Sequence, residues 1–136
     1  MNKLLEQAIA MKDEIISYRR HIHSNPEVGA ELPKTKAYVM DKLREFGYEP
    51  KEICESGIVA TIEGSKPGKT FLLRADMDAL PMKEETSCDF KSTNGCMHSC
   101  GHDMHTAMLL GAANLLKQNQ SQNHSNQTKY KYSKDL

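Results

Sequence analysis

Two short apolar runs separated by a glycine-rich turn constrain the fold of this 136-residue chain most strongly. Residues 58–62 are β-branched and bounded by glycines, which is typical of a strand. Residues 70–75 are apolar on both faces through their middle, as in a central strand of a covered sheet. Helical periodicity precedes these runs over residues 5–22 and 33–46. The order of elements predicts an α/β fold in which helices pack on a mixed sheet.

A third helix is expected to begin near Asp103, a residue type that caps helices. Residues 104–116 leave it almost no polar face, so we expect it to be buried. Residues 118–136 are rich in Gln and Asn and cannot bury enough apolar surface to offset the entropy of ordering. The sequence therefore predicts an ordered, incomplete domain over residues 1–117 and a disordered polar tail over residues 118–136.

Charge and hydropathy narrow the class of protein. Lysine plus arginine equals aspartate plus glutamate, 18 each, and no basic stripe with aromatics is present, so a nucleic-acid partner is not expected. No apolar run reaches the roughly 18 residues of a membrane span, and the first residues lack a signal-peptide core. We therefore expect a cytoplasmic protein without a membrane partner, whose four cysteines are thiols or metal ligands.

Two aspartates follow the second apolar run directly, in the segment RADMDALP. In open α/β sheets, functional residues gather at the carboxyl ends of strands. Asp76 and Asp78 occupy alternate positions there and can serve a metal ion or a proton transfer. Asp is also a common turn residue, so a purely structural turn stays open as an alternative.

Two cysteines and three histidines crowd the segment just before the third helix. Cys100 and His102 lie one residue apart, and a thiolate and an imidazole suit zinc and related first-row metals. One alternative is a closed structural zinc site made by Cys96, Cys100, His102 and His105. Another is a redox pair of Cys96 and Cys100, although their spacing differs from C-x-x-C.

The neighbours of this segment receive supporting roles. Asp103 is a candidate hydrogen-bond partner that would fix the tautomer of a ligand histidine. His98 and His105 are candidate orienting or structural residues. Met104 and Met108 are expected to be core residues rather than ligands.

Three segments together resemble a known family. RRHIHSNPEVGAELPKT at 19–35, LLRADMDALPMKEET at 72–86 and NGCMHSCGHDMHTAMLLGAA at 94–113 are similar to N-terminal signatures of the metal-dependent amidohydrolases. This family includes hippurate hydrolase and N-acetyl-diaminopimelate deacetylase, within the aminoacylase-like metallopeptidases. The resemblance covers residues 1 to about 117.

The resemblance implies specific roles for residues of this chain. Cys100 and His102 match two ligands of a two-metal centre that holds zinc or manganese. Asp78 matches the acidic catalytic residue behind that centre, and Asp76 falls where related branches place a histidine ligand. The implied reaction is hydrolysis of an N-acyl amino acid, such as hippurate, by a metal-activated water.

Several parts of the family's site are not found in this sequence. The resemblance implies a Glu-Glu pair after the third helix, later ligand histidines and a lid domain that mediates dimers. Glu84 and Glu85 precede the Cys100–His102 motif, so they do not replace that pair. The sequence thus predicts a truncated, inactive amidohydrolase chain. The alternative is a small metal-binding or interaction module that uses Cys96, Cys100, His102 and His105.

Overall fold

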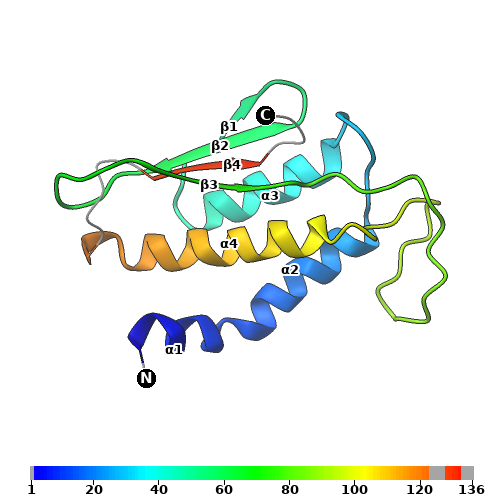
Figure 1. Ribbon diagram of the computed structural model, residues 1–136, viewed down its shortest axis with the longest axis horizontal. Coiled ribbons are helices and arrows are strands. Elements are labelled where there is room, and N and C mark those ends of the chain that lie inside the picture. The colour runs from blue at the N-terminus through cyan, green and yellow to red at the C-terminus, as the bar shows by residue number, and fades with distance from the viewer. Residues whose placement is uncertain (1, 123–127, 133–136) are drawn as a thin grey trace.

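The chain forms one helical layer packed against one face of a four-stranded sheet (Figure 1). The computed structural model describes residues 2–122 and 128–132. The elements run in the order α1 (Lys3–Ala10), α2 (Lys12–Ser24), α3 (Pro33–Glu45), β1 (Lys51–Ile53), β2 (Gly57–Ile62), β3 (Phe71–Ala75), α4 (His102–Gln118), a 3₁₀ turn (Gln120–Gln122) and β4 (Thr128–Tyr132). The α/β fold class with helices on a mixed sheet is confirmed.

Strand β4 lies between β2 and β3, so the order across the sheet is β1-β2-β4-β3 (Figure 1). It pairs antiparallel with β2 and parallel with β3. The prediction of a disordered tail is therefore wrong for residues 128–132. In this slot the backbone N–H and C=O groups of one short segment pair with strands on both sides, which a composition argument does not consider. Residues 123–127 and 133–136 of the predicted tail lie outside the described residues.

The core lies between the sheet and helices α3 and α4. Val39 and Leu43 from α3, Ile58 from β2 and Leu110 from α4 are all fully buried in one cluster. Tyr48 follows α3 in the chain, and its hydroxyl donates a 2.8 Å hydrogen bond to the backbone oxygen of Ala113 in α4. This contact ties the end of α3 to the middle of α4, the helix that begins at the candidate site.

The N-terminal turn of α4 differs from the prediction. Gly101 is the N-cap residue, with φ of +83°, a conformation that glycine adopts at little cost. Asp103 is not the cap, because the helix already begins at His102 and the Asp103 side chain is 1% exposed inside the fold. This early start brings His102 onto the first turn of α4, directly beside the end of β3.

Two apolar elements, α4 and β3, are more exposed than their sequences predict. Met104 and Met108 are 49% and 56% exposed on α4, so they are not core residues. Phe71 and Leu72 of β3 are 59% and 55% exposed, so this part of β3 is not covered on both faces. Only the opposite stripe of α4, including Leu110, packs on the sheet and on α2. The predicted first helix is also divided into α1 and α2, at Met11.

The described residues contain no helix that is long and apolar enough to cross a membrane.

Candidate functional site

The candidate site lies where the loop after β3 meets the first turn of α4. Two short pairings hold this long loop in place: the Ala79 N–H donates to the Glu27 oxygen at 2.8 Å, and Leu80 and Met97 exchange hydrogen bonds of 3.0 Å. The Thr106 hydroxyl of α4 donates to the Asp76 backbone oxygen at 2.8 Å. The carboxyl end of β3 is thereby fixed beside the helix, as the sequence predicts for Asp76 and its neighbours.

His102 and Asp78 form the best-defined pair of the site. The His102 Nδ1 atom lies 2.9 Å from the Asp78 backbone oxygen and 3.1 Å from Asp78 Oδ1. Both oxygens are acceptors, so Nδ1 carries a proton and donates it to Asp78, and Nε2 is the ring nitrogen that faces the rest of the site. A carboxylate that holds one ring nitrogen while the other faces a metal ion is the usual support for a histidine ligand.

The free side of His102 faces other donor atoms. His102 Nε2 lies 3.8 Å from Asp76 Oδ2. One ligand atom each from Asp76, His102 and His105 lies within 4.8 Å of the others. The Asp76 carboxylate is also held by Arg74, whose Nη2 lies 2.5 Å from Asp76 Oδ1. Imidazole and carboxylate ligands of this kind suit zinc and manganese, so the residues present fit part of a divalent metal site.

Cys100 lies at the edge of this group. Its side chain contacts the Asp78 backbone oxygen at 3.7 Å and the residue is exposed. The structure thus brings the two predicted ligands, Cys100 and His102, to the same backbone oxygen, that of Asp78. Within residues 2–122 and 128–132, Cys100 is not in a group of three donors.

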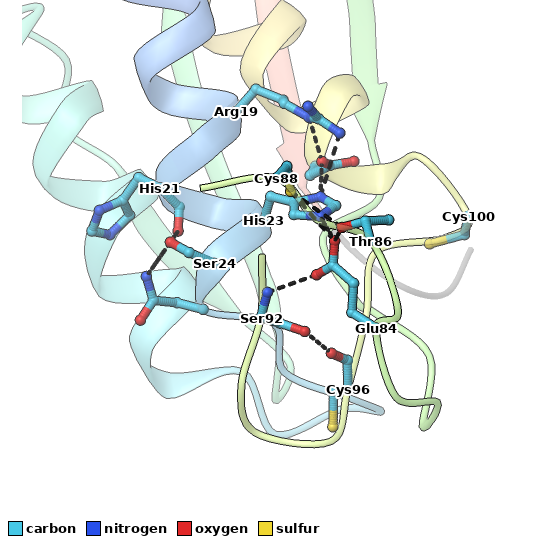
Figure 2. A network of polar contacts seen from close by, with 12 residues as sticks. Arg19, His21, His23, Ser24, Glu84, Thr86, Cys88, Ser92, Cys96 and Cys100 are labelled. Carbon is cyan, nitrogen blue, oxygen red and sulfur yellow. Dashed lines mark hydrogen bonds and ion pairs between the residues drawn. The ribbon is translucent and has the colours of Figure 1, made fainter. Parts of the chain in front are cut away.

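The two rival arrangements of the cysteines are not assembled. Figure 2 shows Cys96 and Cys100 in separate parts of the loop, and all four cysteines are free. In the described part of the chain, Cys96 belongs to no group of three metal-binding side chains. Neither a closed zinc site through Cys96 nor a Cys96–Cys100 disulfide follows from this geometry.

A buried ionic network lies beside the candidate site (Figure 2). His23 Nδ1 and Arg19 Nε of helix α2 each lie 2.7 Å from Asp103 Oδ2. His23 Nε2 lies 3.0 Å from Glu84 Oε1 in the loop. Asp103 therefore contacts His23 and Arg19 of α2 and is not the partner of His102, whose Nδ1 is held by Asp78 instead. The reason is that the first turn of α4 directs Asp103 away from His102.

Glu84 collects hydrogen bonds in the centre of this network. Its Oε1 accepts from Thr86 at 2.5 Å, and its Oε2 accepts from the Ser92 N–H at 2.6 Å. Burial opposes ionisation of this carboxyl, but the hydrogen bonds from Thr86, His23 and Ser92 outweigh it and lower the pKa of Glu84 to about 2. Glu84 is therefore a buried anion that requires a cation nearby.

His98 is the one histidine of the site region whose ring is buried without hydrogen bonds in the described structure. The residue is 3% exposed, and neither Nδ1 nor Nε2 has a partner among the described residues. Burial lowers the pKa of His98 to about 4, against the opposing charge of Asp103. The sequence offered only an orienting or structural role for it.

Sequence reasoning missed the network of Arg19, His23 and Glu84. Arg19 and His23 share one face of α2, but Glu84 is 61 residues from His23 and Asp103 is 80 residues away. No local spacing connects such partners. The only available signal was the presence of these residues inside the segments that carry the family resemblance.

Comparisons with known proteins agree with the resemblance. Residues 72–131 match the family described as peptidase family M20/M25/M40. This match extends past residue 117, where the resemblance noted in the sequence ends. The chain is 44% identical to an N-acyl-L-amino acid amidohydrolase of Geobacillus stearothermophilus over 110 residues, which are 79% of this chain and 30% of that protein. It is 43% identical to the hippurate hydrolase of Campylobacter jejuni over 115 residues, 83% of this chain and 30% of that one.

A solved structure shares the fold. A dinuclear metal binding peptidase from the M20 family of Bacillus subtilis superposes with a TM-score of 0.84 and 33% identity, over 90% of this chain and 35% of that chain. The chain thus spans about a third of the length of the proteins that it matches.

Proposed function

This chain belongs to the peptidase family M20/M25/M40, and we propose that it supplies part of the metal centre of an amidohydrolase that cleaves N-acyl amino acids. The observation that carries the proposal is the His102–Asp78 pair. Asp78 accepts the Nδ1 hydrogen bond of His102 and fixes the orientation of the ring, so that Nε2 faces Asp76. This is the geometry of a supported metal ligand and not of a solvent-exposed histidine.

We assign roles to four side chains on this basis. Cys100 and His102 are the metal ligands, and Asp76 is an additional donor beside His102. Asp78 is a positioning residue that orients the imidazole through Nδ1. A zinc or manganese ion held by these residues would supply Lewis acidity for activation of the amide carbonyl and of water.

The substrate class rests on the matched relatives. The two curated relatives quoted above are an N-acyl-L-amino acid amidohydrolase and a hippurate hydrolase. We propose an N-acyl amino acid of the hippurate type for the whole protein to which these residues belong. Hydrolysis of its amide bond yields a carboxylic acid and a free amino acid.

The 136-residue chain by itself is proposed to be inactive. Hydrolysis requires a general base within hydrogen-bond reach of the activated water. Around the donors Asp76, His102 and His105, the described carboxylates are already engaged: Asp76 with Arg74, and Asp78 with His102. No carboxylate in this part of the chain is left over as the base.

Metal titration tests the ligand assignment. Zinc and manganese binding to the metal-free chain is measured by calorimetry in the wild type, Cys100→Ala, His102→Ala and Cys96→Ala. Loss of a ligand is expected to weaken this site at least about 10-fold in the first two variants, whereas Cys96→Ala binds as the wild type does. Equal binding by all four chains would overturn the assignment.

Activity is tested with a chimaera. The chain is fused in register to the remaining part of the Geobacillus stearothermophilus relative, and release of glycine from hippurate is measured with manganese or zinc present. We expect release by the chimaera, loss of release in its His102→Ala variant, and no release by the chain alone. The proposed function would be contradicted by a folded, metal-loaded chimaera that releases neither glycine from hippurate nor the free amino acid from other N-acyl amino acids.

A further inference from the structure

A second set of metal-binding side chains lies beside Asp103, within the buried network of Figure 2. His23, Glu84 and Cys88 each offer one ligand atom, and these three atoms lie within 4.8 Å of one another. They line a cavity of about 410 Å³ together with Thr86, His98 and Asp103. His23 and Glu84 are buried and Cys88 is half-buried, so this group is not a chance cluster of exposed acidic residues.

The spacing of the donor atoms fits a small tetrahedral ion. With zinc about 2.0 Å from nitrogen and oxygen and about 2.3 Å from sulfur, tetrahedral angles place nitrogen about 3.3 Å from oxygen and oxygen about 3.5 Å from sulfur. In the structure, His23 Nε2 lies 3.0 Å from Glu84 Oε1, which lies 3.7 Å from Cys88 Sγ. These two separations are within a few tenths of an ångström of those in a coordination sphere, and all three ligand atoms lie within 4.8 Å of one another.

The histidine is already oriented as a ligand. His23 Nδ1 lies 2.7 Å from Asp103 Oδ2, which is the carboxylate–histidine arrangement that supports zinc ligands. Arg19 Nε lies 2.7 Å from the same oxygen and holds the carboxylate in place (Figure 2). His23 therefore presents Nε2 to Glu84 and Cys88 with its ring orientation fixed.

The charges of the cluster also suit a divalent cation. Asp103 is paired with the Arg19 guanidinium, and Glu84 faces His23 Nε2. A Cys88 thiolate and the Glu84 carboxylate would together supply two negative charges, which match the two positive charges of a bound divalent ion.

A fourth donor is available in the same cavity. His98 lines it, is 3% exposed, and has no hydrogen-bond partner at either ring nitrogen among the described residues. Its ring centroid lies 6.4 Å from that of His23. A buried imidazole without partners is costly unless something binds it, and an ion held by His23 would face it across the cavity.

We propose that His23, Glu84 and Cys88 form a second metal site that takes zinc or another thiophilic divalent cation, and that is separate from the group around His102. The ion would bind α2 to the loop that leads to α4, and would thus have a structural role. This inference does not rest on the amidohydrolase proposal, because it uses none of Asp76, Asp78, Cys100 or His102.

Cobalt provides a spectroscopic test, since a cysteine–cobalt bond gives a sulfur-to-metal charge-transfer band in the near ultraviolet. The chain carrying Cys54→Ser, Cys96→Ser and Cys100→Ser keeps Cys88 as its only thiol. We expect this chain to develop the band with one equivalent of cobalt, to lose it when one equivalent of zinc is added, and to release the thiol proton of Cys88 into weakly buffered solution on binding. Absence of the band would overturn the proposal.

The matched control is the single variant Cys88→Ser. This substitution keeps the size of the side chain and changes no buried charge. Its fold is checked by circular dichroism before titration. We expect zinc affinity at the second site to fall at least about 10-fold, while any band from Cys100 remains. If Cys88→Ser binds both equivalents as the wild type does, the second site does not exist. If the band from Cys88 forms but the band from Cys100 does not, the result contradicts the proposed function and leaves the second metal site supported.

Discussion

Replacement of Asp103 by Asn tests whether the buried ionic network holds α2 and α4 together. The Asp103 side chain is 1% exposed and its Oδ2 lies 2.7 Å from both Arg19 Nε and His23 Nδ1. Asn keeps the shape but removes the negative charge, so the buried His23 ring and the Arg19 guanidinium lose the carboxylate that both of them contact. Removal of one partner from a buried ion pair typically costs about 3–5 kcal/mol.

The lower end of this range is expected here. The Arg19 side chain is 32% exposed, so solvent screens its share of the loss, whereas the His23 side chain is 5% exposed and carries most of it. A decrease of about 3 kcal/mol in the free energy of unfolding corresponds to about 10 °C in melting temperature for a chain of this size.

Urea unfolding followed by circular dichroism measures the effect, in metal-free buffer. Asp41→Asn is the matched control, because Asp41 pairs with Arg44 at 2.8 Å but the two side chains are 65% and 56% exposed. An exposed pair of this kind contributes about 0.5 kcal/mol or less. If the two variants differ by less than about 1 kcal/mol, the network does not stabilise the fold as argued.

Three further predictions concern stability. In metal-free buffer the free energy of unfolding should fall as the pH falls from 6.5 to about 4, because the pKa of His98 is lowered to about 4 in the fold and the unfolded chain therefore binds the proton first. In acid titrations followed by fluorescence, the variant His98→Asn should show a smaller dependence of stability on pH over this range. Gly57→Ala should cost about 1–3 kcal/mol in urea unfolding, since its Cβ would lie 2.4 Å from the Ile53 backbone oxygen. Tyr48→Phe should cost about 1 kcal/mol in thermal unfolding, through loss of the buried bond to Ala113, and an unchanged midpoint would contradict this.

Local sequence was sufficient for most helices and strands. The helix at Pro33–Glu45 and the strands at Gly57–Ile62 and Phe71–Ala75 agree with their periodicity to within one or two residues. The one-residue spacing of Cys100 and His102 likewise makes them a candidate ligand pair from the sequence alone, and this stays a prediction. In these cases the relevant interactions connect residues that are close along the chain, so their pattern is visible in the sequence.

The tertiary structure decided the rest. Strand β4 is polar in composition, and it forms because β2 and β3 provide paired backbone on both of its sides. The partners of His23 lie 61 and 80 residues away, at Glu84 and Asp103, so no spacing rule relates them. The sequence by itself determined which local elements form and where metal-ligand side chains are concentrated. Which of those side chains meet was decided by packing, because a buried charge is stable only beside partners that the fold brings to it.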